Sequence, residues 1–473
     1  MKSKFVIFSY FGIFFGTLLE TKKTITFFWY DSHVKNKNEK GGLDMKFKKL
    51  VASATLLASA AVLFAGCGSS SNSATKDENK ISVWAWDETF NIKAVNEAKK
   101  VYDNKDVEVD VVTMSQDDIV QKLNTALASG NTDGLPNIVL IEDYRIQGYL
   151  NSYPDAFSEL TDIVDESNFA SYKFAVNKID DQIYGVPFDS GVTANFYRTD
   201  VLEEAGYSQA DMQNLSWDDY LQVARDVKAK TGKKITEVNP SDLGRVRMIM
   251  QEAGEWYTSE DGKTVTIKDN QSLKYGLNLF ATLLKEDLVE QTSDWNAGVT
   301  AIQSGAVASS PIGAWYSSTI QGAEDQSGKW AIAPTPSLPA NMQKAQASNL
   351  GGAGWYVIKG VSGEENAKDF LKKTFATNED LMGTLAKEIG LVSTMLSAKD
   401  QPAYQESSEF YSGQKVFEDF SKWTAEIPQV NYGQETYAIE AVVAESLHRI
   451  INGEDTDKVL ADTQKQVEAQ LAN

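Results

Sequence analysis

The side chains that proteins commonly use for nucleophilic or metal chemistry are scarce in this chain. The sequence holds one cysteine, Cys67, and two histidines, His33 and His448. A structural zinc site needs four ligands drawn mostly from Cys and His, and a serine or cysteine triad needs a histidine beside its nucleophile. The composition therefore disfavours zinc sites, Cys–His pairs and His-based triads, and a single cysteine excludes a disulfide within the chain.

The single cysteine stands at the end of a secretory leader. Three lysines follow Met45, an apolar run reaches Phe64, and the small pair Ala65-Gly66 lies directly before Cys67. In such a leader the basic end stays with the cytoplasmic leaflet while the apolar run enters the translocon. The small residues then fit the peptidase beside a thiol that can take lipid. We therefore expect a lipoprotein signal with lipidation at Cys67.

The residues after the cysteine suit a flexible tether. Residues 68–73 (GSSSNS) have the polar composition of a random coil. Two or more acyl chains hold a protein firmly at a bilayer, whereas a single chain binds only marginally. We assign residues 45–66 to the signal peptide and residues 67–79 to a lipidated tether at the outer face of the cell membrane. No later apolar run has the about 20 residues that a membrane span needs.

Residues 1–44 do not fit this plan. They contain an apolar stretch from Phe5 to Leu19 and then a polar segment without periodicity. Residues 39–42 (EKGG), just upstream of Met45, can be encoded by purines alone, as a ribosome-binding site is. We expect residues 1–44 to be an upstream extension that is not translated, and the alternative is an extra membrane-inserted leader.

Acidic side chains dominate the exported part of the chain. The formal net charge is −21, and residues 1–66 carry ten lysines against four acidic residues, so the remainder carries −27. This excess argues against nucleic acid and against anionic ligands. The length of 473 residues also exceeds what one ordinary core accommodates, which predicts two or more lobes.

The elements that follow the tether predict an α/β lobe. Residues 81–86 and 107–114 alternate as strands do, and residues 91–102 between them have helical character. A further helix over residues 117–128 leads into residues 138–141 (IVLI), whose continuous apolarity suits a strand buried on both faces of a parallel sheet. The order predicts a doubly wound arrangement.

The remainder of the chain is more helical. Strands are expected at residues 183–189 and 193–197, and again at residues 330–333 and 355–358. Three prolines lie between the last two strands, which indicates a segment that crosses between lobes. Further helices are expected from residues 199 and 216, with Ser216 as an N-cap, over 270–285, 364–377, 380–387 and 434–452, and from residue 455.

Several short segments, taken in order, carry a resemblance to a known family. The lipoprotein leader is followed by residues 84–87 (WAWD), 184–189 (YGVPFD) and 351–355 (GGAGW). In this order the chain resembles the family 1 extracellular solute-binding proteins, the maltose-binding-protein-like group that serves carbohydrate ABC importers. The similarity runs from about residue 81 to the C-terminus. Each segment alone is a weak signal, whereas their order and spacing behind the leader are specific.

The resemblance implies a two-lobed periplasmic-binding-protein-like α/β fold. Each lobe is expected to be a mainly parallel sheet flanked by helices, with an interlobe cleft that closes about a hinge. The N-terminal lobe would comprise residues 80–188 with about 338–378, and the C-terminal lobe residues 189–333 with about 379–473. The implied partners are an oligosaccharide and the permease subunits of the importer. The implied protein is a monomer without catalytic residues, cofactor or metal, in a Gram-positive cell.

The resemblance also implies a set of ligand contacts from aromatic and acidic residues. A pyranose has apolar C–H faces and an equator of hydroxyls, so its site needs flat rings and hydrogen-bond acceptors. The expected contacts are Trp86, Asp87, Asp143, Asp189, Trp315, Trp355 and Tyr432. Asp242 and Arg245 lie where a further polar contact is common, but the sequence departs from the family pattern there. Trp256 and Trp295 are weaker candidates, and Trp217, Trp330 and Trp423 are interpreted as structural.

Each expected contact has a structural alternative. The aromatic residues could be core residues of strands, Asp87 could only cap a helix, and Asp143 and Asp189 could form salt bridges. Two other functions also remain open. Paired carboxylates beside aromatics would serve a glycoside hydrolase, and acids with aromatics could hold a polyamine.

The leader generates a prediction about the mature N-terminus. We expect mass spectrometry of protein from the producing cells to find an N-terminal peptide that begins at Cys67 and carries acyl groups, because the signal is removed at that residue. Detection of any peptide from residues 1–44 would contradict the assignment of that segment as untranslated.

Overall fold

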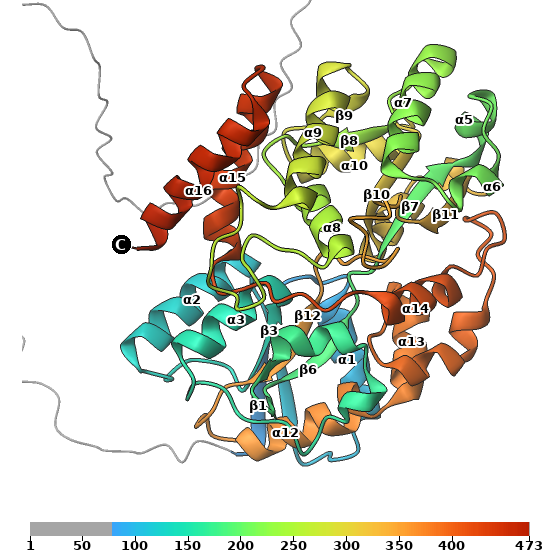
Figure 1. Ribbon diagram of the computed structural model, residues 1–473. Helices are drawn as coiled ribbons and strands as arrows, with labels where there is room; N and C mark the ends of the chain where they lie inside the picture. The colour runs from blue at the N-terminus through green and yellow to red at the C-terminus, as the bar shows by residue number, and fades with distance from the viewer. Residues whose placement is uncertain (1–77, 473) are drawn as a thin grey trace, which may run out of the picture. The chain divides into compact units, whose positions relative to one another are not determined.

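The computed structural model describes residues 78–472 (Figure 1). The predicted upstream extension, the predicted signal peptide, Cys67 and nearly all of the predicted tether lie outside the described residues. Within residues 78–472, none of the helices combines the length and the apolarity needed to cross a bilayer.

A five-stranded mixed sheet forms the core of the N-terminal lobe. Its strand order is β2-β1-β3-β12-β6. Strand β1 pairs in parallel with β2 and β3, and β12 is antiparallel to both β3 and β6. The mainly parallel sheet expected here is confirmed, with β12 as the exception. The strands are β1 (Lys80–Ala85), β2 (Glu108–Thr113), β3 (Ile138–Glu142), β6 (Gly185–Asp189) and β12 (Ala353–Val357).

Helices cover both faces of this sheet because alternate strand residues point to opposite sides. In β1, Trp84 joins the core formed with α2 and α3, whereas Ile81 and Val83 join the core formed with α1, α12 and α13. The apolar run of β3 is buried on both faces, as its sequence predicts. The helices are α1 (Asn91–Val101), α2 (Gln116–Ser129), α3 (Asp143–Ser152), α4 (Phe174–Asn177), α12 (Glu364–Leu371) and α13 (Glu379–Ile389).

The C-terminal lobe is built on smaller sheets. A three-stranded sheet has the order β10-β7-β11 with both pairings antiparallel, and β8 pairs in parallel with β9. The expectation of a mainly parallel sheet in each lobe is therefore wrong for the three-stranded sheet of this lobe. The strands are β7 (Thr193–Arg198), β8 (Thr236–Val238), β9 (Val289–Gln291), β10 (Ser309–Gly313) and β11 (Trp330–Pro334). A small hairpin pairs β4 (Lys178–Ile179) with β5 (Gln182–Ile183).

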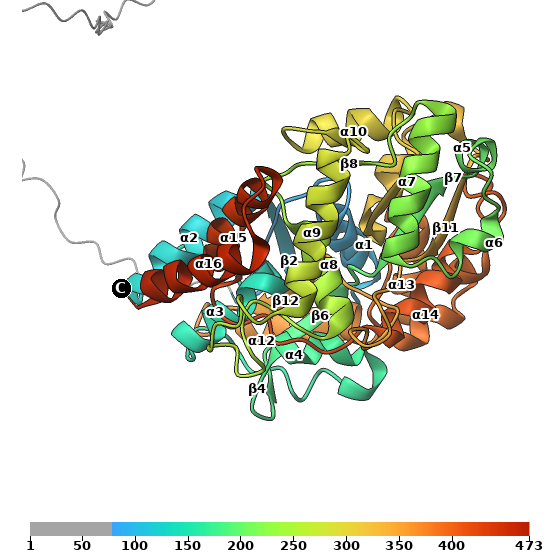
Figure 2. The same ribbon diagram turned by 45° about the horizontal axis from the view of Figure 1, so that its top comes forward.

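Many of the remaining helices surround the three-stranded sheet (Figure 2). Ser216 caps α7 by accepting from the Asp219 amide, as its sequence context predicts. The sequence did not predict α8, α10 or α14. The helices are α5 (Thr199–Glu204), α6 (Gln209–Met212), α7 (Trp217–Thr231), α8 (Gly244–Ala253), α9 (Gln271–Lys285), α10 (Trp295–Gln303), α11 (Ser317–Gln321), α14 (Val416–Glu426), α15 (Thr436–Ile451) and α16 (Thr456–Leu471).

Two of the segments that cross between the lobes lie side by side. The first joins β6 to β7, and the second joins β11 to β12, as the proline-rich stretch predicts. The two crossings are hydrogen-bonded to each other, since Leu350 N donates to Gly191 O at 2.8 Å and Thr193 N to Ser348 O at 3.0 Å. A Cβ on Gly191 would lie 2.4 Å from Leu350 O, so only glycine permits this close approach.

The C-terminal third of the chain divides between the lobes later than expected. Residues 381–404, expected in the C-terminal lobe, contribute Leu381, Leu385 and Tyr404 to the same core as β1 and α1. Helix α14 then contributes Phe420 to the core beneath β7 and β11. The boundary thus lies after residue 404 because the apolar face of α13 packs on the N-terminal lobe.

Candidate functional site

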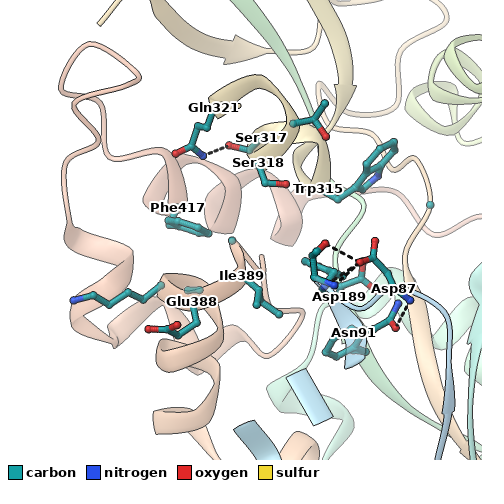
Figure 3. Close-up of a pocket in the computed structure, with 18 of the residues that line it drawn as sticks. Asp87, Asn91, Asp189, Trp315, Ser317, Ser318, Gln321, Glu388, Ile389 and Phe417 are labelled. Carbon is teal, nitrogen blue, oxygen red and sulfur yellow. Dashed lines mark hydrogen bonds between the residues drawn. The ribbon is translucent and has the colours of Figure 1, made fainter. Parts of the chain in front are cut away.

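A cavity of about 1190 Å³ lies between the two lobes (Figure 3). One wall comes from the ends of β1, β3 and β6 and the C-terminal end of α13, and the other from α10, α11 and the turn after β10. The lining includes Trp86, Asp87, Asn91, Gln116, Glu142, Phe188, Asp189, Trp295, Trp315, Ser317, Ser318, Gln321, Glu388, Ile389, Glu406 and Phe417. Carboxylates and aromatic rings therefore meet in one space.

Trp86 and Asp87 follow the end of β1 and are held there by Asn91 of α1. The buried Asn91 Oδ1 accepts from the amides of Trp86 at 3.1 Å and Asp87 at 3.0 Å. Asp87 Oδ1 in turn accepts from the amides of Thr89 and Phe90. Asp87 lines the cavity, and its Oδ1 closes the turn before α1. It is not the N-cap of that helix, which is Phe90.

Asp189 lies at the floor of the cavity, where β6 enters the first crossing. It is 7% exposed, and its Oδ1 accepts from the Ala353 amide at 2.8 Å. Burial raises the pKa of this carboxyl, although the nearby Lys173 ammonium opposes the shift. The side chain is fixed in position, so it can receive a hydrogen bond from a ligand without reorganisation.

Two tryptophans form the opposite aromatic wall. The Trp315 indole is anchored by its Nε1, which donates to Leu350 O at 2.7 Å. Trp295 stacks on Trp315 with ring centroids 5.8 Å apart and planes 30° apart. Trp295 is 55% exposed, which makes it one of only four large apolar side chains that are exposed within residues 78–472. A stacked pair with one open face is a surface on which a sugar ring can pack.

Glu142 supplies a further carboxylate at the end of β3. Its Oε2 accepts from Tyr437 Oη at 2.7 Å and lies 3.4 Å from both Gln116 Nε2 and Arg145 Nε. The sequence predicted a contact from the neighbouring Asp143 instead, but the strand-to-helix turn directs only the Glu142 carboxylate toward the cavity.

Asp143 does not line the cavity, which corrects its assignment as a ligand contact. It is fully buried and paired with Lys173, whose Nζ lies 2.7 and 2.6 Å from the two carboxylate oxygens. Lys173 Nζ also donates to Ala353 O at 2.9 Å and Asp189 O at 3.3 Å. Desolvation raises the pKa of Asp143 to about 6 even though Lys173 acts in the opposite direction. The salt-bridge alternative therefore holds for this residue.

Trp355 and Tyr432 are likewise core residues rather than cavity walls. Trp355 is 0% exposed and stacks on Phe375 at 5.1 Å, because β12 is covered on both faces. Tyr432 is 2% exposed and packs at 4.5 Å against Trp256, which is itself buried. The three tryptophans interpreted as structural are also buried: Trp217, Trp330 and Trp423.

Several polar residues of the cavity were not found from the sequence. Ser317, Ser318 and Gln321 come from α11, and Gln321 Nε2 donates to Ser317 Oγ at 3.2 Å (Figure 3). Glu388 lies near the end of α13 and Phe417 on α14. The sequence gives no local signal for these side chains. They are common residue types in helices and loops, and only the tertiary fold brings them to the cavity. Within residues 78–472 no cluster of three or more His, Cys, Asp or Glu side chains is arranged to hold a metal ion.

Two lobes joined by paired crossings, with a ligand-sized cavity between them, define a hinged solute-binding protein. Residues 92–411 match the model of the family described as bacterial extracellular solute-binding protein. The match covers more than half of the chain, and the chain belongs to this family.

Similar curated proteins carry the names of sugar binders. The chain is 41% identical over 395 residues to a lactose-binding protein of Rhizobium radiobacter. The aligned region covers 83% of this chain and 93% of that protein. It is 25% identical over 372 residues to an arabinooligosaccharide-binding protein of Halalkalibacterium halodurans. This aligned region covers 75% of this chain and 80% of that protein.

Solved structures share the fold. The GacH receptor of Streptomyces glaucescens, solved unliganded and with acarbose, matches with a TM-score of 0.69 at 18% identity, covering 83% of this chain and 98% of that chain. A transporter-associated binding protein of B. animalis subsp. lactis, solved with β-1,6-galactobiose, matches with a TM-score of 0.65 at 22% identity, covering 82% of this chain and 96% of that chain. At these identities the likeness shows the two-lobed architecture alone.

The buried ion pair generates a stability prediction. We expect Lys173→Met to lower the free energy of unfolding by about 3–5 kcal/mol, because it leaves the Asp143 carboxylate buried without a cation. Changing both partners, Asp143→Leu with Lys173→Met, removes that charge and should restore most of the loss. Urea denaturation of the single and double variants measures the coupling. If the loss of unfolding free energy in the double variant equals the sum of the losses in the two single variants, the coupling between Asp143 and Lys173 is contradicted.

Proposed function

We propose that this chain binds a short, neutral oligosaccharide in the cavity between its lobes and delivers it to an ABC importer. The observation that carries the proposal is the pairing of flat rings with carboxylates across one space. Trp315, with Trp295 stacked on it, stands opposite Asp87 and Asp189 (Figure 3). Anionic ligands are disfavoured because these acids lie at the cavity surface.

The residue types account for both affinity and selectivity. One stacked sugar ring buries roughly 100 Å² of apolar surface, which contributes about 2–3 kcal/mol before association costs. A hydrogen bond to a charged group adds about 1.5–3 kcal/mol in favourable cases. Two rings with several such bonds suffice for micromolar binding. A ligand without the matching hydroxyl leaves a buried carboxylate unpaired, which favours the correct sugar.

Lactose is the first ligand that we propose. Its support is the relative named as a lactose-binding protein, which is 41% identical over most of both chains. The volume of about 1190 Å³ exceeds the roughly 300–1,000 Å³ of ordinary small-molecule sites, so the cavity also has room for a longer saccharide.

The proposed delivery mechanism rests on the hinge and on the leader. The two paired crossings connect the lobes and allow rotation about them, so a ligand that touches both walls stabilises the closed form. The closed form would dock on the permease subunits. Lipid on Cys67 and the polar tether would keep the protein at the outer face of the membrane. The site is proposed to bind without catalysis, in keeping with a family of binding proteins.

Calorimetric titration of the segment from Gly68 onward tests the proposed ligand. We expect lactose and related short oligosaccharides to bind, because the relative that is 41% identical is named as a lactose-binding protein, and we expect spermidine and putrescine not to bind. Failure of every saccharide, or tight binding of a polyamine, would contradict the proposal. Release of a monosaccharide during incubation with lactose would contradict binding without catalysis.

The same titration on variants assigns the walls. Trp315→Ala removes a stacking ring and should weaken lactose about 30- to 150-fold, the equivalent of about 2–3 kcal/mol. Asp189→Asn keeps an acceptor for the Ala353 amide but loses the charge, and should weaken lactose about 10- to 100-fold. Asp155→Asn is the matched control because this carboxylate is 99% exposed and lies outside the cavity lining. Equal affinities for the Asp189 and Asp155 variants would remove Asp189 from the site.

The anchor has its own test. A Cys67→Ser variant has no thiol to carry lipid, so we expect the protein to move from the membrane fraction to the medium while its lactose affinity stays unchanged. Fractionation of producing cells measures the distribution. Retention at the membrane of variant chains from which the leader has been removed would contradict anchoring through Cys67.

A further inference from the structure

A tyrosine outside the cavity holds one of the carboxylates that line it. Tyr437, in the first turn of α15, donates from Oη to Glu142 Oε2 at 2.7 Å across 295 positions of the chain. Glu142 lines the cavity, whereas Tyr437 does not. Within residues 78–472 the hydrogen bonds and the ion pair of this carboxylate all reach Oε2, so Oε1 stays available to a ligand.

Two arginines hold the Tyr437 ring beside Glu142. The Arg145 guanidinium of α3 lies 4.2 Å from the ring centroid, and the Arg247 guanidinium of α8 lies 5.6 Å from it. An aromatic face attracts a cation placed over it, so each arginine restrains the phenol. Burial, and then the Glu142 charge, raises the pKa of Tyr437 well above its ordinary value. The hydroxyl therefore keeps its proton and remains a donor.

The start of α15 is itself anchored by hydrogen bonds. Thr436 Oγ1 accepts from Trp256 Nε1 at 3.0 Å and donates to Tyr432 O at 2.7 Å. Residues 427–435, which we call the connecting segment, join α14 to α15 and end directly before this anchor.

The connecting segment contacts both lobes. Gln251 of α8, in the C-terminal lobe, donates from Nε2 to Pro428 O at 2.7 Å. Gly148 of α3, in the N-terminal lobe, lies so close that a Cβ on it would be 2.9 Å from Gln434 O. Tyr437 follows this segment within three residues, so its bond to Glu142 joins a cavity carboxylate to a part of the chain that bridges the lobes.

We propose that Tyr437 is a positioning residue for the ligand. It orients the Glu142 carboxylate so that Oε1 accepts from a hydroxyl of the bound saccharide, and it couples that contact to the connecting segment. This inference rests on the proposed function. Without the phenol hydroxyl, Oε2 retains only Gln116 and Arg145, each 3.4 Å away, and the carboxylate has to be ordered when the ligand binds. An acceptor that is held in advance avoids this ordering cost.

A double-mutant cycle on lactose affinity tests the positioning role. We expect Tyr437→Phe, which keeps the stacked ring and removes only the hydroxyl, to weaken lactose about 5- to 20-fold. Glu142→Ala should weaken lactose as well, because it removes the contact itself. In the Glu142→Ala background, Tyr437→Phe should change the affinity by less than about twofold, because the tyrosine acts through that carboxylate. A residue that only supports the fold would weaken binding equally in both backgrounds.

Tyr207→Phe is the matched control for this cycle. Tyr207 Oη donates to Asp226 Oδ2 at 2.6 Å, which is a bond of the same kind between groups outside the cavity. We expect this variant to bind lactose as the wild type does, and thermal melting checks that every variant folds. If Tyr437→Phe also binds as the wild type does, or weakens lactose equally in both backgrounds, the positioning role is overturned while the proposed function stands. If the wild type binds no saccharide, the proposed function fails and this role fails with it.

Hydrogen exchange tests the coupling to the connecting segment. At saturating lactose we expect the amides of residues 427–435 to exchange more slowly than in the free wild type, because the ligand fixes Glu142 and through it Tyr437. In Tyr437→Phe at saturating lactose this slowing should be largely lost. Equal slowing in the wild type and in the variant would overturn the coupling.

Discussion

The buried pair of Lys173 and Asp143 holds the floor of the cavity in place. The ammonium group reaches the carboxylate and also the backbone carbonyls of Asp189 and Ala353, so it joins α3 to the inner ends of β6 and β12. Taking two charges out of water costs several kcal/mol for each ion, and such a pair persists only where its hydrogen bonds are complete. The backbone accommodates it at Gly352, whose φ is +89° and whose Cβ would lie 2.8 Å from Asp143 Oδ2. The position of the Asp189 carboxylate above this floor follows from that pair.

The floor and the aromatic wall meet at the crossings, and this arrangement connects ligand contact to lobe movement. Trp315 belongs to the C-terminal lobe but is tied to Leu350 O in the second crossing, so its ring stays near the hinge. Trp295 stacks outward from it and keeps 55% of its surface exposed. Asp87 stands on the other lobe, at the end of β1. A ligand that spans Trp295 and Asp87 therefore gains contacts only when the lobes approach, which is the differential affinity that a closure mechanism requires.

Local sequence patterns predicted the helices and strands better than they predicted the side-chain directions of the residues at the ends of those elements. The apolar run of β3 and the cap at Ser216 were predicted because each depends on neighbours in sequence. The choice between Glu142 and Asp143 depended instead on Lys173, thirty residues away, which no periodicity reveals. Trp355 was misassigned because the sequence of a strand covered on both faces can look the same as that of a strand with one open face. Side-chain direction at a strand end is a tertiary property.

The paired tryptophans also affect how affinity should depend on the length of a saccharide. The loss of translational and rotational freedom on binding is paid once, whereas each further ring that stacks contributes its own apolar burial. A single ring therefore recovers too little to bind well, even in a site that fits it. Two linked rings in the cavity can contact the open face of the tryptophan pair and the carboxylates of Asp87, Asp189 and Glu142, which line the same space. The geometry thus favours a ligand of at least two rings, and the cavity volume of about 1190 Å³ limits how long that ligand can be.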